Sequence, residues 1–328
     1  MKPETTTDMP SPELTIIIVN WNSGGFLEQC LQSIRDNLPA DHAKVVVVDN
    51  ASSDGSPEMV RRKFPEYEVI ESGGNIGFGK ANNLALHSCD TPLVLFLNPD
   101  TIVLPGSLEK MTTFLKQNAD VGAVGCRMRF EDGEVQPLGL QWFPTPLTEL
   151  FTLLFLSSGS LKLLKGVLPH KDPTRSGYVT KLYGGCLLVR KVVLDRVGYF
   201  DERFFMYCED VDLCQRIHRD GWKIYYMSEA EIIHHCGGSS RTAEGEFSTL
   251  MKCESISRLM EKYYGKAGAL FYRGSVFVAS PARIAVILVA RLLRSVFGKK
   301  PGPEIVPFQK YLSMMAWSLK IKEPRVSG

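Results

Sequence analysis

The sequence predicts an α/β protein built on an open, mostly parallel sheet that is flanked by helices. The first observation is that apolar, β-branched runs alternate with segments of helical periodicity between residues 14 and 97. The second is an ordinary globular composition, with 44% hydrophobic and 23% charged residues among 328. The third is a formal net charge of +2 and a mean hydropathy of -0.05. These values disfavour a dedicated nucleic-acid-binding protein and a polytopic membrane protein.

Strands and helices are expected to alternate up to residue 97, in the pattern of parallel βαβ units. Each strand is predicted from a short apolar run, and these runs are residues 14–19, 44–48, 68–70 and 93–97. Each helix is predicted from apolar residues at helical spacing, over residues 26–38, around 59–64 and around 80–87. Pro39 ends the first helix because proline has no backbone N–H to continue it.

The second half of the chain continues the mixture of strands and helices. A strand is expected over residues 184–189, entered through Gly184 and Gly185. A helix is expected over 210–220, and the apolar runs 223–227 and 230–233 predict strand that leads into two histidines. Residues 1–12 have no apolar core, so they are predicted to be a short disordered lead and not a signal peptide.

Polar side chains follow the predicted strands where each of them ends. They are Asn20, Asp49, Asn75 and Asp100. Because open α/β sheets bind ligands beyond the carboxyl ends of their strands, this placement indicates a binding edge. The alternative is that these residues only form turns, as Asn and Asp commonly do. Neither GxGxxG after the first strand nor a Walker lysine motif is present, so a nucleotide at this edge would not use a standard phosphate loop.

Two acids at the start of the predicted helix 210–220 point in different directions. At 100° per residue, Asp210 shares a face with Cys214 and Ile217, whereas Asp212 faces away and can pair with Arg216. An acid on an apolar face tends to have a raised pKa, which suits proton transfer. The alternative role for Asp210 is an N-terminal charge that complements the helix dipole.

Two histidines end the last predicted strand, next to a glycine-containing loop. His234 and His235 at that position, together with Asp100 on another loop, suit Mg²⁺ or Mn²⁺ near a diphosphate. HExxH spacing is absent, which disfavours a hydrolytic zinc site. The eight cysteines include no CxxC pair, so we expect small buried side chains in a reducing cytosol and not a zinc ribbon.

Six segments in this order resemble the family 2 glycosyltransferases, which have the GT-A fold, and within them the rhamnosyltransferase-like branch. The segments are TIIIVNWNSGGFLEQCLQSI, VVVVDNASSDGS, GGNIGFGKANNLAL, FLNPDT, YGGCLLVRKVVLDRVGYFDERFFMYCEDVDLCQRIHRDGW and IIHHCGGSS. They span about residues 14–240, which is roughly two thirds of the chain. The resemblance implies a GT-A domain over 13–262, with a nucleotide-sugar-binding half (13–120) and an acceptor and catalytic half (121–262).

The resemblance also implies a role for particular residues. It makes Glu209 and Asp210 the catalytic pair, with Asp210 as the general base. It makes Asp100 and His234 the metal ligands, because the spacing from His234 to Gly237, Ser239 and Ser240 fits the family's His-x-x-Gly-x-Ser-Ser pattern. His235 is the alternative, because Gly238 and Ser240 lie at the same offsets from it. The family's DxD motif often has aspartate where this chain has Asn98. The nucleotide-sugar-binding residues would be Asn20, Asn22, Asp49, Asn50, Asn75, Lys80, Asn98 and Asp100.

The function implied by the resemblance is inverting transfer of a sugar, with Mg²⁺ or Mn²⁺ as cofactor. The leading donor is dTDP-rhamnose, other dTDP-, UDP- or GDP-sugars remain open, and the acceptor is a saccharide or a lipid-linked saccharide in surface polysaccharide assembly. The enzyme would be cytoplasmic and peripheral on the inner face of the membrane. Alternatives are a non-catalytic sugar-nucleotide-binding subunit and, opposed by the missing GxGxxG, an NAD-dependent oxidoreductase.

The C-terminal extension, residues 263–328, has a distinctive charge pattern. No acidic residue lies between Glu261 and Glu304, whereas eight lysines and arginines do. Because its uninterrupted apolar runs are shorter than the ~20 residues of a membrane crossing, we expect an amphipathic segment lying on an anionic membrane surface. The alternatives are an oligomer contact and ordinary packing. The Leu- and Phe-rich stretch 147–168 is expected to be an acceptor-side segment or a packing helix.

Overall fold

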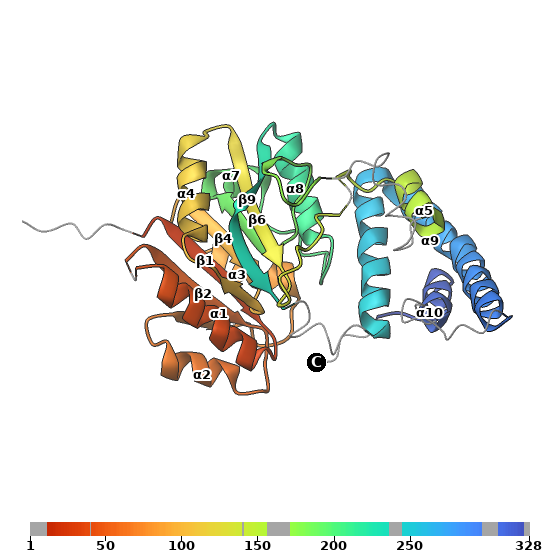
Figure 1. Cartoon of the computed structure of the whole chain (residues 1–328), viewed down its shortest axis with the longest axis horizontal. Helices are drawn as coiled ribbons and strands as arrows, with labels where there is room; N and C mark the ends of the chain where they lie inside the picture. Colours follow the sequence, from red (N-terminus) through yellow and green to blue (C-terminus); the bar gives the residue numbers. More distant parts are fainter. Residues whose placement is uncertain are drawn as a thin grey trace, which may run out of the picture.

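The computed structural model describes residues 12–39, 41–139, 141–155, 171–235, 245–296 and 308–324. These residues form a central sheet with helices on both faces and, to one side of it, a separate group of helices (Figure 1). The α/β class predicted from the alternating pattern is confirmed. The predicted lead lies outside the described residues except for its last position, as do the glycine and serine positions of the pattern that follows His234.

The first half of the chain follows the predicted order closely. Its elements are β1 (Leu14–Asn20), α1 (Gly24–Asn37), β2 (Ala43–Asp49), α2 (Ser56–Lys63), β3 (Glu68–Glu71), α3 (Phe78–Leu86), β4 (Leu93–Leu97), β5 (Thr101–Val103), α4 (Ser107–Gln117) and β6 (Val121–Arg129). The second half contains α5 (Pro146–Phe155), β7 (Gly177–Tyr178), β8 (Cys186–Arg190), α7 (Lys191–Val197), α8 (Glu209–Arg219), β9 (Lys223–His234), α9 (Glu246–Val296) and α10 (Phe308–Ser318).

The sheet is mixed, and its parallel part carries the predicted binding edge. Within the described residues the strand order is β3-β2-β1-β4-β8-β6-β9-β5, and β7 pairs with β9. Pairing is parallel from β3 to β4 and between β6 and β9, whereas β8 runs antiparallel to both of its neighbours. The two apolar runs before His234 form one strand, whose pairing with β6 has an irregularity between Cys126 and Arg127.

Alternation along the parallel strands builds a core on each face of the sheet. Ile16 and Ile18 of β1 face α1, α2 and α4, while Ile17 and Val19 face α3, α7 and α8. Burying about 25 cal/mol per Å² of apolar surface makes these two cores the main source of stability. The loops after β1, β2 and β3 are therefore held at one edge by strands that are covered on both sides.

A third core joins the C-terminal helices to the loop before α8. It contains Phe204 of that loop, Leu259 and Tyr272 of α9, and Trp317 of α10. The boundary expected between residues 262 and 263 falls inside α9, just before Gly265, where the backbone leaves the helical region with φ of 69° and bends the helix. Because residues on both sides of the bend share this core, packing continues across the expected boundary.

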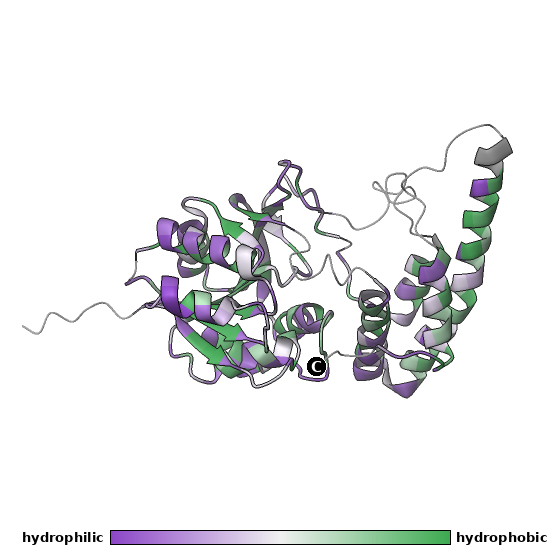
Figure 2. Cartoon of the chain, turned by 90° about the horizontal axis from the view of Figure 1, so that it is seen from below, coloured by the Kyte–Doolittle hydropathy of each residue, from purple (hydrophilic) through white to green (hydrophobic). Residues whose placement is uncertain are grey.

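The last part of α9 projects away from the group of helices and is coloured mainly as hydrophobic (Figure 2). Val278, Val286 and Leu292 are each more than 60% exposed. Among the described residues, one stretch, Glu246–Val289, is long and apolar enough to cross a membrane by length and composition. The sequence interpretation expected an amphipathic segment here and judged its apolar runs too short for a crossing, because isolated polar residues interrupt them.

Candidate active site

The loops after β1 and β2 are tied together beneath the predicted binding edge by Asn20. Its side-chain amide donates hydrogen bonds to Asp49 Oδ1 (2.8 Å), Ser52 Oγ (2.9 Å) and Ser56 Oγ (2.6 Å). Asn20 is 0% exposed, so its side chain positions Asp49 and the serine loop and is closed to direct contact with a ligand. Asn22 is exposed and also connects the loops after β1 and β2, because its Oδ1 accepts a hydrogen bond from the backbone N–H of Ser53 (2.7 Å).

The glycine-rich loop after β3 is clamped by Asn50. The Asn50 side chain donates to Asn75 Oδ1 (2.9 Å) and accepts from the Ile76 backbone N–H (3.0 Å). Gly77 has φ of 87°, and a Cβ there would lie 2.4 Å from the Phe205 carbonyl oxygen. Only glycine allows this approach, which brings the loop of the first half against the segment that precedes α8.

The side chains of Asp100 and His234 lie next to each other. His234 Nε2 lies 3.3 Å from Asp100 Oδ1 and 3.4 Å from Asn98 Nδ2. The two residues are brought together because β5 pairs with β9, with Thr101 opposite His234. A carboxylate oxygen and an imidazole nitrogen side by side fit a divalent cation. The described residues contain no group of three His, Cys, Asp or Glu side chains for a metal, so a cation here would need further oxygen ligands from substrate or water.

A pair of glycines connects this site to the predicted base. The Gly184 backbone N–H donates to Asp210 Oδ2 (2.9 Å), and the Gly185 carbonyl accepts from the Asn98 backbone N–H (3.0 Å). A continuous path of contacts therefore runs from Asp210 through Gly184, Gly185 and Asn98 to His234. The segments near residues 100, 210 and 234, which are far apart in sequence, are linked through these contacts.

The Glu209–Asp210 pair begins α8, and the pKa values of its two carboxyl groups are shifted by different neighbours. Burial, and then the neighbouring Asp210 charge, raises the pKa of Glu209 to about 8. Burial also raises the pKa of Asp210, while hydrogen bonds from the Gly184 and Val211 backbone N–H groups oppose that rise. Glu209 is 7% exposed, and its Oε2 has no hydrogen-bond partner among the described residues. Burial thus favours the neutral form of both carboxyl groups, and the two backbone hydrogen bonds favour the charged form of Asp210.

A strained turn presents this pair. Tyr207 and Cys208 have φ of 70° and 68°, which are unfavourable for residues with side chains. Helix α9 holds the turn, because Tyr207 Oη lies 2.9 Å from Ser248 Oγ and the Ser255 hydroxyl donates to the Met206 carbonyl (2.7 Å). Helix α9 thus holds the turn that precedes Glu209 and Asp210.

The remaining predicted residues lie farther from the path between Asp100 and Asp210. Lys80 is exposed and pairs with Glu202 at 3.9 Å. His235 turns away from Asp100: its ring lies against Phe26, with 5.0 Å between centroids, and its Nδ1 pairs with Glu131. The structure thus brings His234, and not the alternative His235, to the carboxylate of Asp100.

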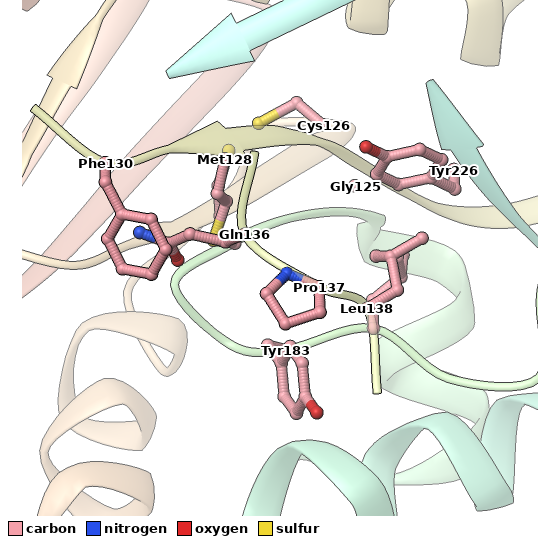
Figure 3. Close-up of a pocket in the computed structure, with 11 residues that line it drawn as sticks. Gly125, Cys126, Met128, Phe130, Gln136, Pro137, Leu138, Tyr183 and Tyr226 are labelled. Carbon is pink, nitrogen blue, oxygen red and sulfur yellow. The ribbon is translucent and has the colours of Figure 1, made fainter. Parts of the chain in front are cut away.

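A cavity of about 210 Å³ opens beside the same path (Figure 3). Its walls are mostly apolar, and Met128, Leu138 and Tyr183 line it together with Gln136. Gln136 also contacts His234: its Nε2 donates to the His234 carbonyl (2.9 Å), and its Oε1 lies 3.1 Å from His234 Nδ1. Sequence reasoning missed Gln136, because it lies in a loop without periodicity and belongs to none of the motifs.

The sequence model of glycosyl transferase family 2 matches residues 15–197. The chain belongs to glycosyl transferase family 2. It is 30% identical over 245 residues to N-acetylglucosaminyl-diphospho-decaprenol L-rhamnosyltransferase of Mycobacterium tuberculosis, covering 68% of this chain and 76% of the relative. It is 28% identical over 240 residues to rhamnosyltransferase WbbL of Escherichia coli, covering 69% and 85%. The protein is therefore a glycosyltransferase, and the resemblance to the rhamnosyltransferase-like branch is confirmed.

Solved structures confirm the fold of this glycosyltransferase. The mannosyltransferase PcManGT from Pyrobaculum calidifontis, in complex with GDP-mannose and Mn²⁺, superposes with a TM-score of 0.59 at 18% identity, covering 94% of this chain and 87% of the other. GalNAc-T7 with UDP, GalNAc and Mn²⁺ superposes with a TM-score of 0.53 at 13% identity, covering 79% and 53%. At these identities the likeness establishes the GT-A fold alone.

Proposed function

We propose that this glycosyltransferase transfers rhamnose from dTDP-rhamnose, with inversion, to a saccharide or lipid-linked saccharide acceptor during cell-surface polysaccharide assembly. The two relatives named as rhamnosyltransferases support the sugar. The diphospho-decaprenol in the name of the mycobacterial relative supports a lipid-linked acceptor. A further relative, the O-antigen biosynthesis protein RfbC of Myxococcus xanthus, is 26% identical over 234 residues and supports the polysaccharide assignment.

The observation that carries the proposal is the continuous path from Asp210 to Asp100. The two residues between Asp210 and Asn98 on that path are glycines, and their backbone approaches neighbouring side chains closely: a Cβ at Gly185 would lie 3.2 Å from Met128 Cε. A base at one end and a cation-binding pair at the other are the two groups that displacement of a nucleoside diphosphate requires. This arrangement supports catalysis by the chain itself.

In the proposed reaction Asp210 removes the proton from the acceptor hydroxyl. The hydroxyl oxygen forms a bond to the anomeric carbon of the donor while the bond from that carbon to the diphosphate breaks, which inverts the configuration. Asn20, Asp49, Asn50 and Asn75 hold the loops that enclose the nucleoside. Asp100 and His234 would hold Mg²⁺ or Mn²⁺, which supplies positive charge to the departing diphosphate. Mn²⁺ in the two structural neighbours supports such a cofactor.

We place the acceptor saccharide in the cavity beside Gln136 and Tyr183. Tyr183 directly precedes Gly184, whose N–H binds the proposed base, so the cavity is next to the proton acceptor. The mostly apolar walls suit the less polar face of a sugar ring, and the Tyr183 ring offers a flat surface for it. The cavity lies within residues 121–262, the half of the domain for which the family resemblance implies acceptor binding.

Purified full-length protein incubated with a set of nucleotide sugars tests this proposal. We expect release of dTDP from dTDP-rhamnose that depends on a polyprenyl-diphosphate-linked amino sugar acceptor and on Mg²⁺ or Mn²⁺. Parallel reactions with UDP- and GDP-sugars provide the control for the donor, and the delipidated acceptor provides the control for the lipid. Transfer only from a UDP- or GDP-sugar would exclude dTDP-rhamnose, and no turnover with any donor would exclude the enzymatic proposal.

We also propose that the end of α9 binds an anionic membrane surface on the cytoplasmic side. Exposed Val286 and Val289 lie one turn apart on the projecting part of the helix, and this region contains basic residues but no acidic ones. Apolar side chains beside cations are the pattern of an interfacial helix. Such contact would bring the cavity near a lipid-linked acceptor.

Flotation with liposomes tests the membrane proposal. We expect the wild type to float with vesicles containing anionic lipid, and the double variant Val286→Asp, Val289→Asp to remain at the bottom, because both apolar contacts are replaced by charges that anionic lipid repels. The matched control is Val192→Asp on α7, since Val192 is also 60% exposed but lies on the sheet domain. Equal flotation of the wild type and the double variant would contradict the proposal.

A further inference from the structure

The contact between Gln136 and His234 fixes the orientation of both side chains. A backbone carbonyl only accepts hydrogen bonds, so the Gln136 atom that is 2.9 Å from the His234 carbonyl must be the donating Nε2. The other amide atom, Oε1, is then the one that faces His234 Nδ1 at 3.1 Å. Because Oε1 can only accept, the favourable arrangement has the proton on Nδ1.

This choice of tautomer determines what the other ring nitrogen can do. A neutral imidazole with its proton on Nδ1 has a lone pair on Nε2. His234 Nε2 is the atom that faces Asp100 Oδ1 and Asn98 Nδ2, at 3.3 and 3.4 Å. The lone pair is therefore directed to the position where a cation would also contact the Asp100 carboxylate.

The backbone anchors Gln136 independently of the ring that it contacts. Its own N–H donates to the Met128 carbonyl at 2.8 Å, and Met128 is at the end of β6, which pairs with β9. Gln136 also lines the cavity, as Figure 3 shows, so the same residue borders both the cavity and the imidazole. A side chain held on this frame restrains the rotation of the His234 ring as well as its tautomer.

We propose that Gln136 is a positioning residue that prepares His234 to bind a divalent cation through Nε2. The inference rests on the proposed function, in which His234 and Asp100 hold the cation. Partners behind a metal-ligating histidine typically change metal affinity by about 10–100-fold. Gln136 therefore acts through His234, and its loss should weaken cation binding before any chemistry takes place.

The first experiment measures binding of Mn²⁺ to full-length protein in the presence of dTDP, from the electron paramagnetic resonance signal of free Mn²⁺. Gln136→Ala is expected to raise the Kd for Mn²⁺ about 10–100-fold. Gln136→Glu keeps an acceptor oxygen opposite Nδ1 but loses the donor to the His234 carbonyl, so it should restore only part of the affinity. Glu134→Ala, an exposed position in the same loop, is the matched control and should bind Mn²⁺ as the wild type does.

The second experiment observes the tautomer directly, by long-range ¹H–¹⁵N correlation spectra of the His234 ring in metal-free protein. We expect a proton on Nδ1 in the wild type and loss of that preference in Gln136→Ala, a change that a general packing defect would not produce. Wild-type Mn²⁺ affinity in Gln136→Ala, together with weakened binding in His234→Ala, would overturn this inference alone. Wild-type affinity in His234→Ala would overturn the proposed metal site and this inference with it.

Discussion

Replacement of Asp210 by Asn is expected to lower turnover by at least about 10²-fold while nucleotide binding is retained. General-base catalysis typically contributes 10²–10⁴-fold, and an amide cannot accept the proton of the acceptor hydroxyl. Asn keeps the size of the side chain and an oxygen that can accept from the Gly184 N–H, although its NH2 group cannot accept from the Val211 N–H as Asp210 Oδ1 does. The measurement is the steady-state rate of nucleoside diphosphate release, with nucleotide affinity determined in parallel.

The pH profile gives this prediction a second readout. Burial raises the pKa of Asp210 above its ordinary value of 3.8, and the base works only when ionised. The value of kcat/KM should therefore fall as the pH is lowered through that raised pKa, at a higher pH than an exposed aspartate would require. Near-normal turnover in Asp210→Asn, or an acid limb at the position of an ordinary aspartate, would remove Asp210 from the role of base.

The strands that could be predicted are those that an uninterrupted apolar run in the local sequence is enough to identify. β1, β2 and β4 are β-branched or apolar runs that are buried on both faces, so their predicted bounds differ from the observed ones by no more than two residues at either end. β6 was not predicted because glycines interrupt it. A Cβ at Gly122 would lie 2.9 Å from the Trp222 side chain, and one at Gly125 would lie 2.9 Å from Leu182. Tertiary packing requires glycine at these two positions, and a pattern in a single sequence does not report tertiary packing.

The residues of the candidate site likewise fall into two groups: those that local sequence predicts and those that depend on tertiary structure. Asp210 and His234 could be predicted because spacing on a helix and position at a strand end are local properties. Their convergence depends on the antiparallel placement of β8 between β4 and β6, which no local pattern specifies. The burial of Asn20 and the contact of Gln136 with His234 arise only once the strands have assembled. Residues that position others were therefore harder to predict than residues that carry a charge at the site.

Asp212 shows how much of the catalytic helix depends on α9. The sequence places Asp212 on the face opposite Asp210 and pairs it with Arg216, and the Arg216 Nε–Asp212 Oδ2 distance of 2.8 Å confirms the pair. Asp212 is nevertheless 0% exposed, because α9 covers that face. The Tyr263 hydroxyl donates to Asp212 Oδ1 at 2.8 Å, and Lys262 pairs with the same oxygen. One carboxylate thus joins α8 to the helix that also supports the turn before Glu209.

Replacement of Asp212 by Ala should lower the free energy of unfolding by about 3 kcal/mol, because it leaves Arg216, whose side chain is only 17% exposed, without its carboxylate partner, whereas Lys262 keeps its ion pair with Asp201 at 2.7 Å. Urea unfolding of the full chain measures the loss. The matched control is Asp195→Ala, which removes another i,i+4 partner, that of Lys191, but from a half-exposed position, and should cost less than about 1 kcal/mol. Equal losses in the two variants would show that the buried carboxylate does not hold α8 to α9.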